Sequence, residues 1–482
     1  MAAVSSLGIG SGLDLNALLA GIKAGEQAPL AALQKQQSSY TTKLTAYGQL
    51  SGALSGLQSA AAALAKPELF QGVKASSTAS DVLTATALST TSSGTYALDV
   101  TQLSQSQSLA AKGVANNATF GAGTVTIDFG TIRGGSLDAS TGKYTGAAFA
   151  PGATPSAMPL TIDAGSTLTD IAKKINDSTD IGVTASIVND GSTSPNRLVL
   201  TSKLTGEATS MKITVTGDAA LKTLLANNPE GSAAEQLQQS AIARDTKLTV
   251  NGIAITSATN SVVGAIKDVT MSVSKIGTTT VSVQQDSASV QSAVTNFVTA
   301  YNSLKSVAGR LTAFDPASKS GAVLLGDSTL RNIQTGIRSA LTTAQTPDGS
   351  GLTMLSQIGI SFQKDGTLAV DSTKLAAALG SKMSGVANLF SGGAGGFGVK
   401  MSALVAGYTD TTGGVLTAAT KGINKTLDSL AKQYSATSER VEATVARYKA
   451  QFSQLDTMMS RMNQTSSYLT QQFDAINNSN KK

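Results

Sequence analysis

The 482-residue sequence contains no cysteine, no histidine and no tryptophan. Without cysteine the chain cannot form a disulfide, a thiolate nucleophile, a zinc finger or an iron–sulfur site. Without histidine it has no base for a Ser-His-Asp triad, no imidazole metal ligand and no side chain that ordinarily titrates near neutral pH. These absences exclude most hydrolase and metalloenzyme mechanisms and leave carboxylate pairs and Ser–Lys dyads as the catalytic groups to consider.

Charge and aromatic side chains are also scarce, at 14% and 4% of the residues. The net charge of +6 is the small surplus of 36 Lys and Arg over 30 Asp and Glu residues, and the basic residues are scattered along the chain, so we expect no nucleic-acid partner. No run of 18 apolar residues occurs, and we therefore expect no membrane span. Residues 1–21 lack a basic start and are interrupted by Asp14, which is unlike a Sec signal peptide.

The motifs that resemble catalytic or cofactor sites lack their required context. Gly393, Gly395 and Gly398 fit G-x-G-x-x-G, but a helical pattern precedes them and no acidic residue follows at the required distance. We interpret residues 391–398 as a flexible loop. The pattern S-x-x-K recurs at about chance frequency in this serine-rich chain, without the S-D-N and K-T-G motifs. We expect no enzyme, no catalytic residues, no cofactor and no metal site.

Long amphipathic helices are predicted at both ends of the chain. Apolar residues recur at steps of three and four from Leu15 to Leu64, with Pro29 expected to open a second stretch and Pro67 to end it. A stripe with the same spacing runs from Leu427 to Ile476 and would span roughly 75 Å as one helix. A third such stripe covers residues 290–311.

Strand patterns fill the middle of the chain. They lie at residues 96–100, 125–129, 160–162, 183–188, 198–200, 211–215, 248–250, 253–255, 269–273 and 279–283. Asn251-Gly252 predicts a hairpin turn, and Thr167 with Asp170 predicts a capping box for a helix over 168–175. Residues 113–157 are rich in Gly, Ala, Thr and Pro and are expected to form mostly loops.

A mixed region follows the third stripe. A helix is expected after Asp327, strands at 358–362 and 367–370 with a turn at Asp365-Gly366, and a short helix capped by Ser372 or Thr373 that ends at Gly380. The fold class is thus α+β and multidomain: long N- and C-terminal coiled-coil-like helices form a stalk, and β-rich head domains are inserted between them.

Apolar stripes of this kind more often cover a protein's own core than a special interface. Here the terminal helices are long, and little else in the termini could cover them. Burying about ten large apolar side chains yields roughly 15–30 kcal/mol, whereas ordering some 50 backbone units costs on the order of 50–100 kcal/mol before hydrogen bonding. We therefore hypothesise that both termini are poorly ordered in the free subunit and fold when subunits assemble.

The expected oligomer or filament interface comprises Leu44, Tyr47, Leu54, Leu57, Val441, Tyr448, Phe452, Leu455, Met459, Met462, Leu469, Phe473 and Ile476.

Several local motifs resemble the family of flagellar filament-capping proteins, also called hook-associated protein 2. They occur in order over nearly the whole chain, and residues 113–240 match least. The matching segments are Ile9-Gly10-Ser11-Gly12-Leu13-Asp14, Gly94-Thr95-Tyr96 through Leu103, Phe297-Val298 with Ala300-Tyr301-Asn302, Leu325-Gly326-Asp327, Ile358-Gly359-Ile360, Asp365-Gly366-Thr367-Leu368 and Leu389-Phe390.

The resemblance implies a division into four domains, three of them discontinuous. Residues 1–40 and 441–482 would form a terminal coiled-coil domain, and 41–75 with 286–440 a helical leg domain. Residues 76–112 and 244–285 would form an inner β head domain, and 113–243 an outer, variable β-rich head domain.

The resemblance also implies a function. The protein would leave the cell through the flagellar type III export system and form a ring of five or six subunits at the distal, extracellular tip of the flagellum. Beneath this plate flagellin would fold and insert, without nucleotide hydrolysis. Other implied partners are the hook–filament junction proteins and a cytoplasmic export chaperone at the C-terminal helix.

Two alternatives belong to other functional classes. The first is a surface adhesin that binds host mucin or glycans through the head domains, which some members of the resembled family also do. The second is an enzyme acting on cell-wall material, which the absence of histidine and the weak Ser–Lys patterns disfavour.

Overall fold

The computed structural model describes residues 14–152, 159–346 and 349–479, which fall into two compact units. The helical unit combines the N-terminal residues up to Phe70 with everything from Ser287 onward, and the β unit comprises Gln71–Asp286. The expected α+β class with long terminal helices is confirmed. The seven-segment division into domains stays a prediction, and the opening motif at residues 9–13 lies outside the described residues.

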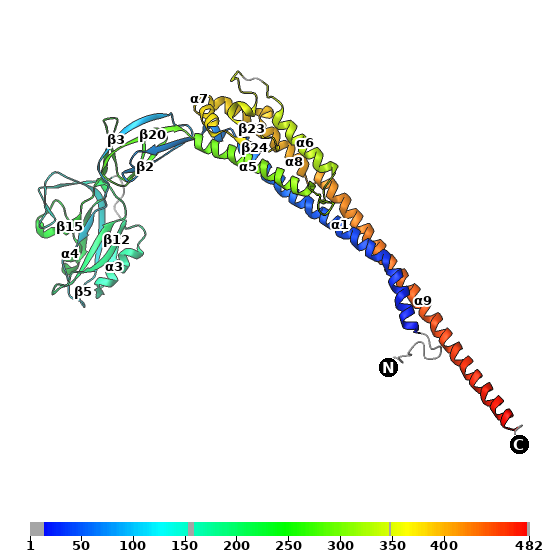
Figure 1. Ribbon diagram of the computed structural model, residues 1–482. Coiled ribbons are helices and arrows are strands. Elements are labelled where there is room, and N and C mark those ends of the chain that lie inside the picture. Colours follow the sequence, from blue (N-terminus) through cyan, green and yellow to red (C-terminus); the bar gives the residue numbers. More distant parts are fainter. Residues whose placement is uncertain (1–13, 153–158, 347–348, 480–482) are drawn as a thin grey trace. The chain divides into compact units, whose positions relative to one another are not determined.

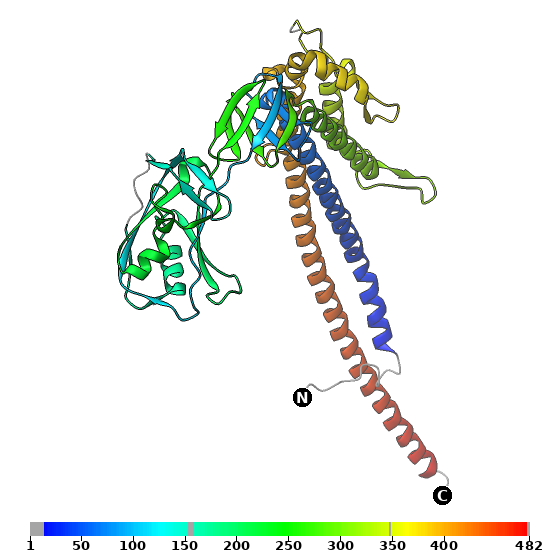
Figure 2. The ribbon, with the colours of Figure 1, turned by 90° about the vertical axis from the view of Figure 1, so that its left-hand side faces the viewer.

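The two terminal helices lie side by side in the helical unit and run in opposite directions (Figures 1 and 2). The helices that build this unit are α1 (Leu15–Leu64), α5 (Ser287–Thr312), α6 (Ser328–Thr342), α7 (Ser372–Ser391), α8 (Phe397–Thr409) and α9 (Val415–Ser479), and α2 (Glu68–Gln71) follows α1. Between them lie the hairpins β21–β22 (Phe314–Asp315, Ser320–Gly321) and β23–β24 (Ile360–Phe362, Leu368–Val370), and the 3-10 turns η3 (Leu355–Ile358) and η4 (Gly393–Gly395).

The core of the helical unit lies along the predicted faces of α1 and α5. Leu50, Leu54, Leu57, Ala61 and Leu64 of α1 are completely buried, and they follow one another at steps of four and three. Val290, Val294 and Phe297 of α5 belong to the same core, as do residues of α6, α7, α8 and the first turns of α9. The apolar spacing therefore identified these core faces correctly.

A polar network joins α1 to the start of α6. The Asp327 carboxylate caps α6 by accepting a hydrogen bond from the Leu330 amide (3.0 Å), as the predicted helix after Asp327 requires. It also accepts one from the Tyr47 hydroxyl (2.7 Å) and pairs with Lys43 (3.1 Å). Burial and the hydrogen bond to Asp327 raise the pKa of Tyr47 to about 12. Burial acts to raise the pKa of Asp327 too, but its three hydrogen bonds and the Lys43 charge outweigh that effect and hold it below the usual range.

Four expectations for the helical unit are wrong. Pro29 lies inside one continuous α1 instead of opening a new stretch; the neighbouring Leu30 is buried, and its packing helps to offset the missing backbone hydrogen bond. Asp371, and neither Ser372 nor Thr373, caps α7, because its carboxylate accepts from the amides of Thr373 and Lys374. The helix passes Gly380 and breaks instead at Lys382, continuing to Ser391. Residues 391–398 hold η4 and the start of α8.

Close packing between α8 and α1 explains why residue 398 is a glycine. A Cβ at this position would lie 2.9 Å from the backbone of Leu64 and Ala65 and 3.0 Å from the Ala61 oxygen. The bare backbone lets α8 approach the C-terminal end of α1. The third glycine of the G-x-G-x-x-G pattern is therefore a helix-packing residue.

The β unit contains two separate cores. The inner lobe has a five-stranded sheet, in the order β1 (Val73–Ser77), β20 (Gly277–Gln285), β3 (Gly94–Gln102), β16 (Thr246–Val250) and β17 (Ile253–Ser257), and a three-stranded sheet of β18 (Ser261–Ile266), β19 (Val269–Val273) and β2 (Leu83–Ala87). Their facing residues, such as Leu98, Val100, Met271 and Val281, form one core. All pairings in these sheets are antiparallel.

The outer lobe has its own sheets and two helices. One sheet contains β10 (Leu160–Ile162), β6 (Gly123–Arg133), β14 (Ser210–Gly217) and β9 (Ala148–Pro151); the other has β12 (Val183–Asn189), β13 (Asn196–Ser202), β4 (Ser108–Ala110) and β15 (Gln238–Ala241). The pairs β5–β11 (Thr119–Phe120, Ser166–Thr167) and β7–β8 (Ser136–Asp138, Lys143–Thr145), with α3 (Leu168–Asp177), α4 (Ala219–Leu225) and the 3-10 turns η1 (Glu207–Thr209) and η2 (Ala233–Glu235), complete it.

Two predictions for the β unit are confirmed, the hairpin turn at Asn251-Gly252 and the capping box of α3. Asn251 and Gly252 both have positive φ and connect β16 to β17 as a two-residue hairpin. Thr167 and Asp170 form the predicted capping box of α3. The interpretation of residues 113–157 as mostly loops is wrong for the described residues 113–152, because β5 to β9 occupy more than half of them. Residues 153–157 lie outside the described residues. The Thr and Phe residues of the described part favour strands, and its glycines occupy turns, such as Gly134 and Gly135, with positive φ.

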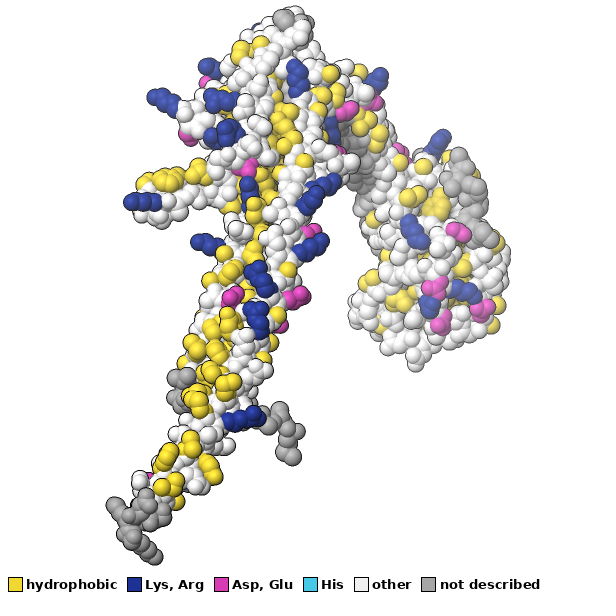
Figure 3. All heavy atoms as spheres, turned by 90° about the vertical axis from the view of Figure 1, so that its right-hand side faces the viewer, with side chains coloured by type: hydrophobic (Ala, Val, Ile, Leu, Met, Phe, Trp, Pro, Cys, Tyr) yellow, Lys and Arg dark blue, Asp and Glu magenta, His cyan; other side chains and the backbone are white. Residues whose placement is uncertain are grey.

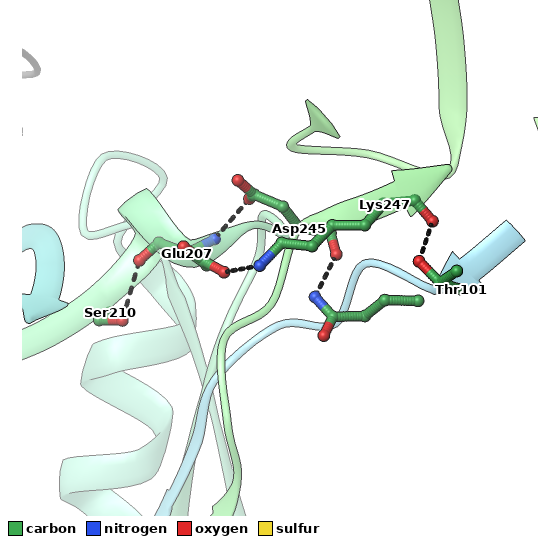
Figure 4. Close-up of polar contacts among 6 residues, drawn as sticks. Thr101, Glu207, Ser210, Asp245 and Lys247 are labelled. Atoms are coloured by element: carbon green, nitrogen blue, oxygen red, sulfur yellow. Dashed lines mark hydrogen bonds and ion pairs between the residues drawn. The ribbon is translucent and has the colours of Figure 1, made fainter. Parts of the chain in front are cut away.

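Polar contacts connect β16 of the inner lobe to η1 of the outer lobe (Figure 4). The Glu207 amide donates to the Asp245 carboxylate (2.7 Å), and Lys247 pairs with Glu207 (3.2 Å). Gln102 donates to the Asp245 carbonyl (2.7 Å), and Thr101 donates to the Lys247 carbonyl (3.1 Å). These bonds satisfy main-chain groups where the chain passes between the two cores.

Asp327→Ala should lower the free energy of unfolding of the helical unit by about 2–4 kcal/mol, since it removes a helix cap and leaves the Tyr47 hydroxyl without its acceptor. Tyr47→Phe, which keeps the cap, should cost about 1 kcal/mol. Urea denaturation followed by helical circular dichroism measures both.

Because the pKa of Asp327 is lowered, its ionised form stabilises the fold above its ordinary pKa, and this contribution is lost as the pH falls through the lowered pKa. A deficit for Asp327→Ala that does not shrink in acid would contradict this assignment.

Gly398→Ala should destabilise the helical unit by about 1–3 kcal/mol, because the added methyl group meets the backbone of α1. Gly407→Ala in the same helix is the matched control: nothing lies within 4 Å of its Cβ, so it should stabilise the unit by about 0.5–1 kcal/mol. Thermal denaturation of the two variants compares them directly. Equal effects would show that close packing does not require Gly398.

Candidate assembly surface

Helix α9 is longer than the helix it pairs with. Gln34 of α1 donates a hydrogen bond to the hydroxyl of Tyr434 of α9 (3.2 Å), which fixes where the antiparallel pair meets. Since α1 begins at Leu15, its first residue lies opposite about residue 453 of α9. The remainder of α9 up to Ser479 extends roughly 40 Å beyond the start of α1.

One apolar stripe on α9 passes from the core into solvent. Val441 is buried, and Tyr448 and Phe452 are half-buried. Further along, Leu455 is 41%, Met462 59% and Phe473 62% exposed. Figure 3 shows hydrophobic side chains continuing along the helical pair toward its far end. We call Leu455, Met459, Met462, Leu469, Phe473 and Ile476 the open stripe.

The surroundings of the open stripe are polar but nearly uncharged. Between Gln451 and Asn477 the charged residues are Asp456, Arg461 and Asp474, and all three fall off the stripe at about 100° per residue. Serine, threonine, glutamine and asparagine fill most of the other positions. An apolar face with a neutral polar border can be covered by another helix without burying a charge.

The predicted interface residues fall into two groups. Tyr47, Leu54, Leu57 and Val441 lie in the subunit's interior, and Leu44 packs against that core. Only separation of the helices would let the four buried residues contact a neighbour, whereas Leu44 is half-buried. The other eight, from Tyr448 to Ile476, are half-buried or exposed along α9. That they contact other subunits stays a prediction, as does the disorder of the termini before assembly.

Two further large side chains on the projecting part of α9 are exposed but do not belong to the predicted interface. Met458, at 67% exposure, borders the open stripe and was passed over because the step of four from Leu455 selects Met459. Tyr468 is 60% exposed and lies about 140° from the centre of the stripe, so helical spacing correctly left it out.

Within the described residues, no cluster of three or more acidic side chains is placed to bind a metal ion. In the same ranges, none of the helices has the length and apolar character of a membrane span. A chain whose ends pair as long helices, with an apolar face left open along one of them, has an architecture typical of structural proteins that assemble through terminal helices.

Comparison with known proteins identifies the family. The models "Flagellar hook-associated protein 2 N-terminus" and "Flagellar hook-associated protein 2 C-terminus" match residues 11–107 and 243–464, and "Flagellin hook IN motif" matches residues 141–204. The chain belongs to the flagellar hook-associated protein 2 family.

Relatives support this assignment over the full length. Flagellar hook-associated protein 2 of Escherichia coli K12 is 38% identical over 497 residues, with 100% of both chains covered. The Salmonella typhimurium protein is 38% identical, covering 99% of this chain and all of its own. The crystal structure of the D1-D2-D3 domains of the E. coli flagellar cap protein FliD aligns with a TM-score of 0.59 at 31% identity, covering 79% of this chain and 99% of that one.

Phe473→Ser should weaken self-association of the purified chain roughly 10- to 100-fold, because it removes a large apolar side chain from the open stripe. Tyr468→Ser removes a side chain of similar size and exposure from another face of the same helix and should change it little. Sedimentation equilibrium over a range of protein concentrations measures the association constant. Equal weakening by both substitutions would argue against the stripe as the contact face.

Proposed function

We propose that this protein caps the distal end of the bacterial flagellar filament and promotes folding and insertion of flagellin beneath an oligomeric plate, without nucleotide hydrolysis. Membership of the hook-associated protein 2 family supports the cap role, and the E. coli relative of known structure is a flagellar cap protein. The observation that carries the proposal is the open stripe, an apolar helical face suited to a neighbouring helix at a filament end.

In this proposal the cap is a homo-oligomer of five or six subunits. The open stripe of α9 occupies positions at the filament tip that the helices of flagellin or of the hook–filament junction proteins would otherwise occupy. The same helix is the contact for a cytoplasmic export chaperone, which would cover the stripe before export by the flagellar type III system. Covering the stripe in each location avoids leaving apolar surface exposed to water.

Movement of the cap requires contacts that form and break repeatedly. Methionine side chains are flexible and adapt to irregular surfaces, and Met459 and Met462 lie at the centre of the open stripe. Ser466 interrupts the stripe and limits its affinity further. Burial of each incoming flagellin's own apolar surface would supply the free energy for displacement, so no nucleotide site is needed.

Deleting the gene in its own bacterium should release monomeric flagellin into the medium and abolish filaments. The wild-type gene should restore filaments, whereas Met462→Ser combined with Phe473→Ser should not, although the variant is still exported. Tyr468→Ser should restore them fully. Electron microscopy of cells and immunoblotting of the medium for flagellin and for the cap itself measure the outcome. Normal filaments on the deletion strain would refute the proposal.

A further inference from the structure

Methionine is the one sulfur-containing residue type in this chain. The sequence has ten methionines and no cysteine. Methionine and cysteine are the side chains that two-electron oxidants convert reversibly, so reversible sulfur oxidation of this protein can take place only at methionine. Met1 and Met158 lie outside the described residues, and the other eight differ sharply in their exposure to solvent.

Four of the described methionines are shielded by the hydrophobic cores of the two units. Three of them are completely buried and the fourth is 7% exposed. An oxidant in solution therefore reaches their sulfur atoms only when the chain opens. These four are Met211, Met271, Met383 and Met401.

Three of the remaining four described methionines lie within five consecutive residues of α9. Met458 is 67% exposed and Met462 59% exposed, and Met459 between them is half-buried. The fourth, Met354, is 39% exposed and lies outside α9, at the start of η3. Oxidation of methionine follows its accessibility, so a peroxide should react first at Met458 and Met462. We call Met458, Met459 and Met462 the methionine cluster.

Oxidation of the methionine cluster changes the face that is proposed to assemble. Met459 and Met462 belong to the open stripe, and Met458 borders it. A sulfoxide replaces the apolar thioether with a polar group, whose oxygen accepts hydrogen bonds from water. Covering that oxygen with the apolar face of another helix removes the water without supplying a donor, which is unfavourable. Sulfoxides in the methionine cluster therefore oppose the contact that the open stripe favours.

We propose that the methionine cluster is an oxidation site that controls assembly of the free subunit. A peroxide transfers one oxygen atom to the thioether sulfur: the sulfur loses two electrons, the O–O bond breaks, and the rest of hydrogen peroxide leaves as water. The oxidised subunit does not assemble, whereas a subunit that has already assembled keeps Met459 and Met462 covered and reduced. Methionine sulfoxide reductases reverse the change. This inference rests on the proposed role of the open stripe as the assembly contact.

Mass spectrometry of peptides from the full chain, after a short treatment with hydrogen peroxide, tests the chemical step. Each sulfoxide adds the mass of one oxygen atom. Met458 and Met462 should oxidise roughly tenfold or more faster than the buried Met401. Raising the protein concentration until the chain self-associates should slow the oxidation of Met462 but not that of Met354. Equal rates at Met462 and Met401, or a rate at Met462 that does not respond to protein concentration, would overturn the inference.

Sedimentation equilibrium before and after the treatment tests the effect on assembly. The association constant of the wild-type chain should fall roughly 10- to 100-fold and should recover after incubation with methionine sulfoxide reductases A and B. The triple variant Met458→Leu, Met459→Leu, Met462→Leu should lose no association on treatment. Met354→Leu, the matched control, should lose as much as the wild type. Circular dichroism confirms that each treated variant is still folded.

Two results of this experiment would refute the oxidation site. One is unchanged association of a treated wild-type chain in which Met458 and Met462 are oxidised, and the other is an equal loss in the triple variant. The Phe473→Ser variant separates this failure from a failure of the proposed function. If Phe473→Ser weakens association and oxidation does not, the open stripe remains the contact face and only the oxidation site is wrong. If neither weakens association, both proposals are wrong.

Discussion

The candidate assembly surface depends on a mismatch in length between two paired helices. Helix α1 has 50 residues and α9 has 65, and their antiparallel pairing leaves the last turns of α9 without α1 alongside. An isolated helix gains little stability from backbone hydrogen bonds alone, and most helical stability comes from packing of an apolar face. The open stripe is therefore the part of the subunit with the most to gain from a neighbour.

The rest of the helical unit makes this extension possible. Complete burial of the α1 stripe against α5 and α8 anchors the pair, and Gly398 permits the close approach of α8. The Asp327 network fixes α6 against the same helix. The first turns of α9 stay packed in this core while its other end projects, so the residues that fold the subunit differ from those proposed to assemble it.

Periodicity and turn chemistry predicted most of the fold from the sequence. The steps of three and four gave the helices, and Asn251-Gly252, Thr167 with Asp170, and Asp327 marked boundaries because each side chain satisfies specific backbone groups. Predictions failed where tertiary packing overrides local preference. Pro29 is carried inside α1, and a glycine-rich segment at 391–398 enters a helix because α8 must lie close to α1.

The candidate sites show what periodicity leaves out. An apolar stripe shows which face of a helix is packed but not what packs against it. Leu54 and Phe473 follow the same spacing, yet Leu54 is covered by the subunit's own helices and Phe473 is exposed. The difference lies in where α1 begins relative to α9, which only the three-dimensional register determines. A basic cavity of the outer lobe, lined by Lys112, Lys143, Arg197, Lys212 and Lys222, is the opposite case, since these cations are scattered along the sequence and carry no motif. Antiparallel pairing of the strands brings these cations around one cavity. Because they are far apart in the sequence, a search for a linear basic tract does not detect their local surplus of positive charge.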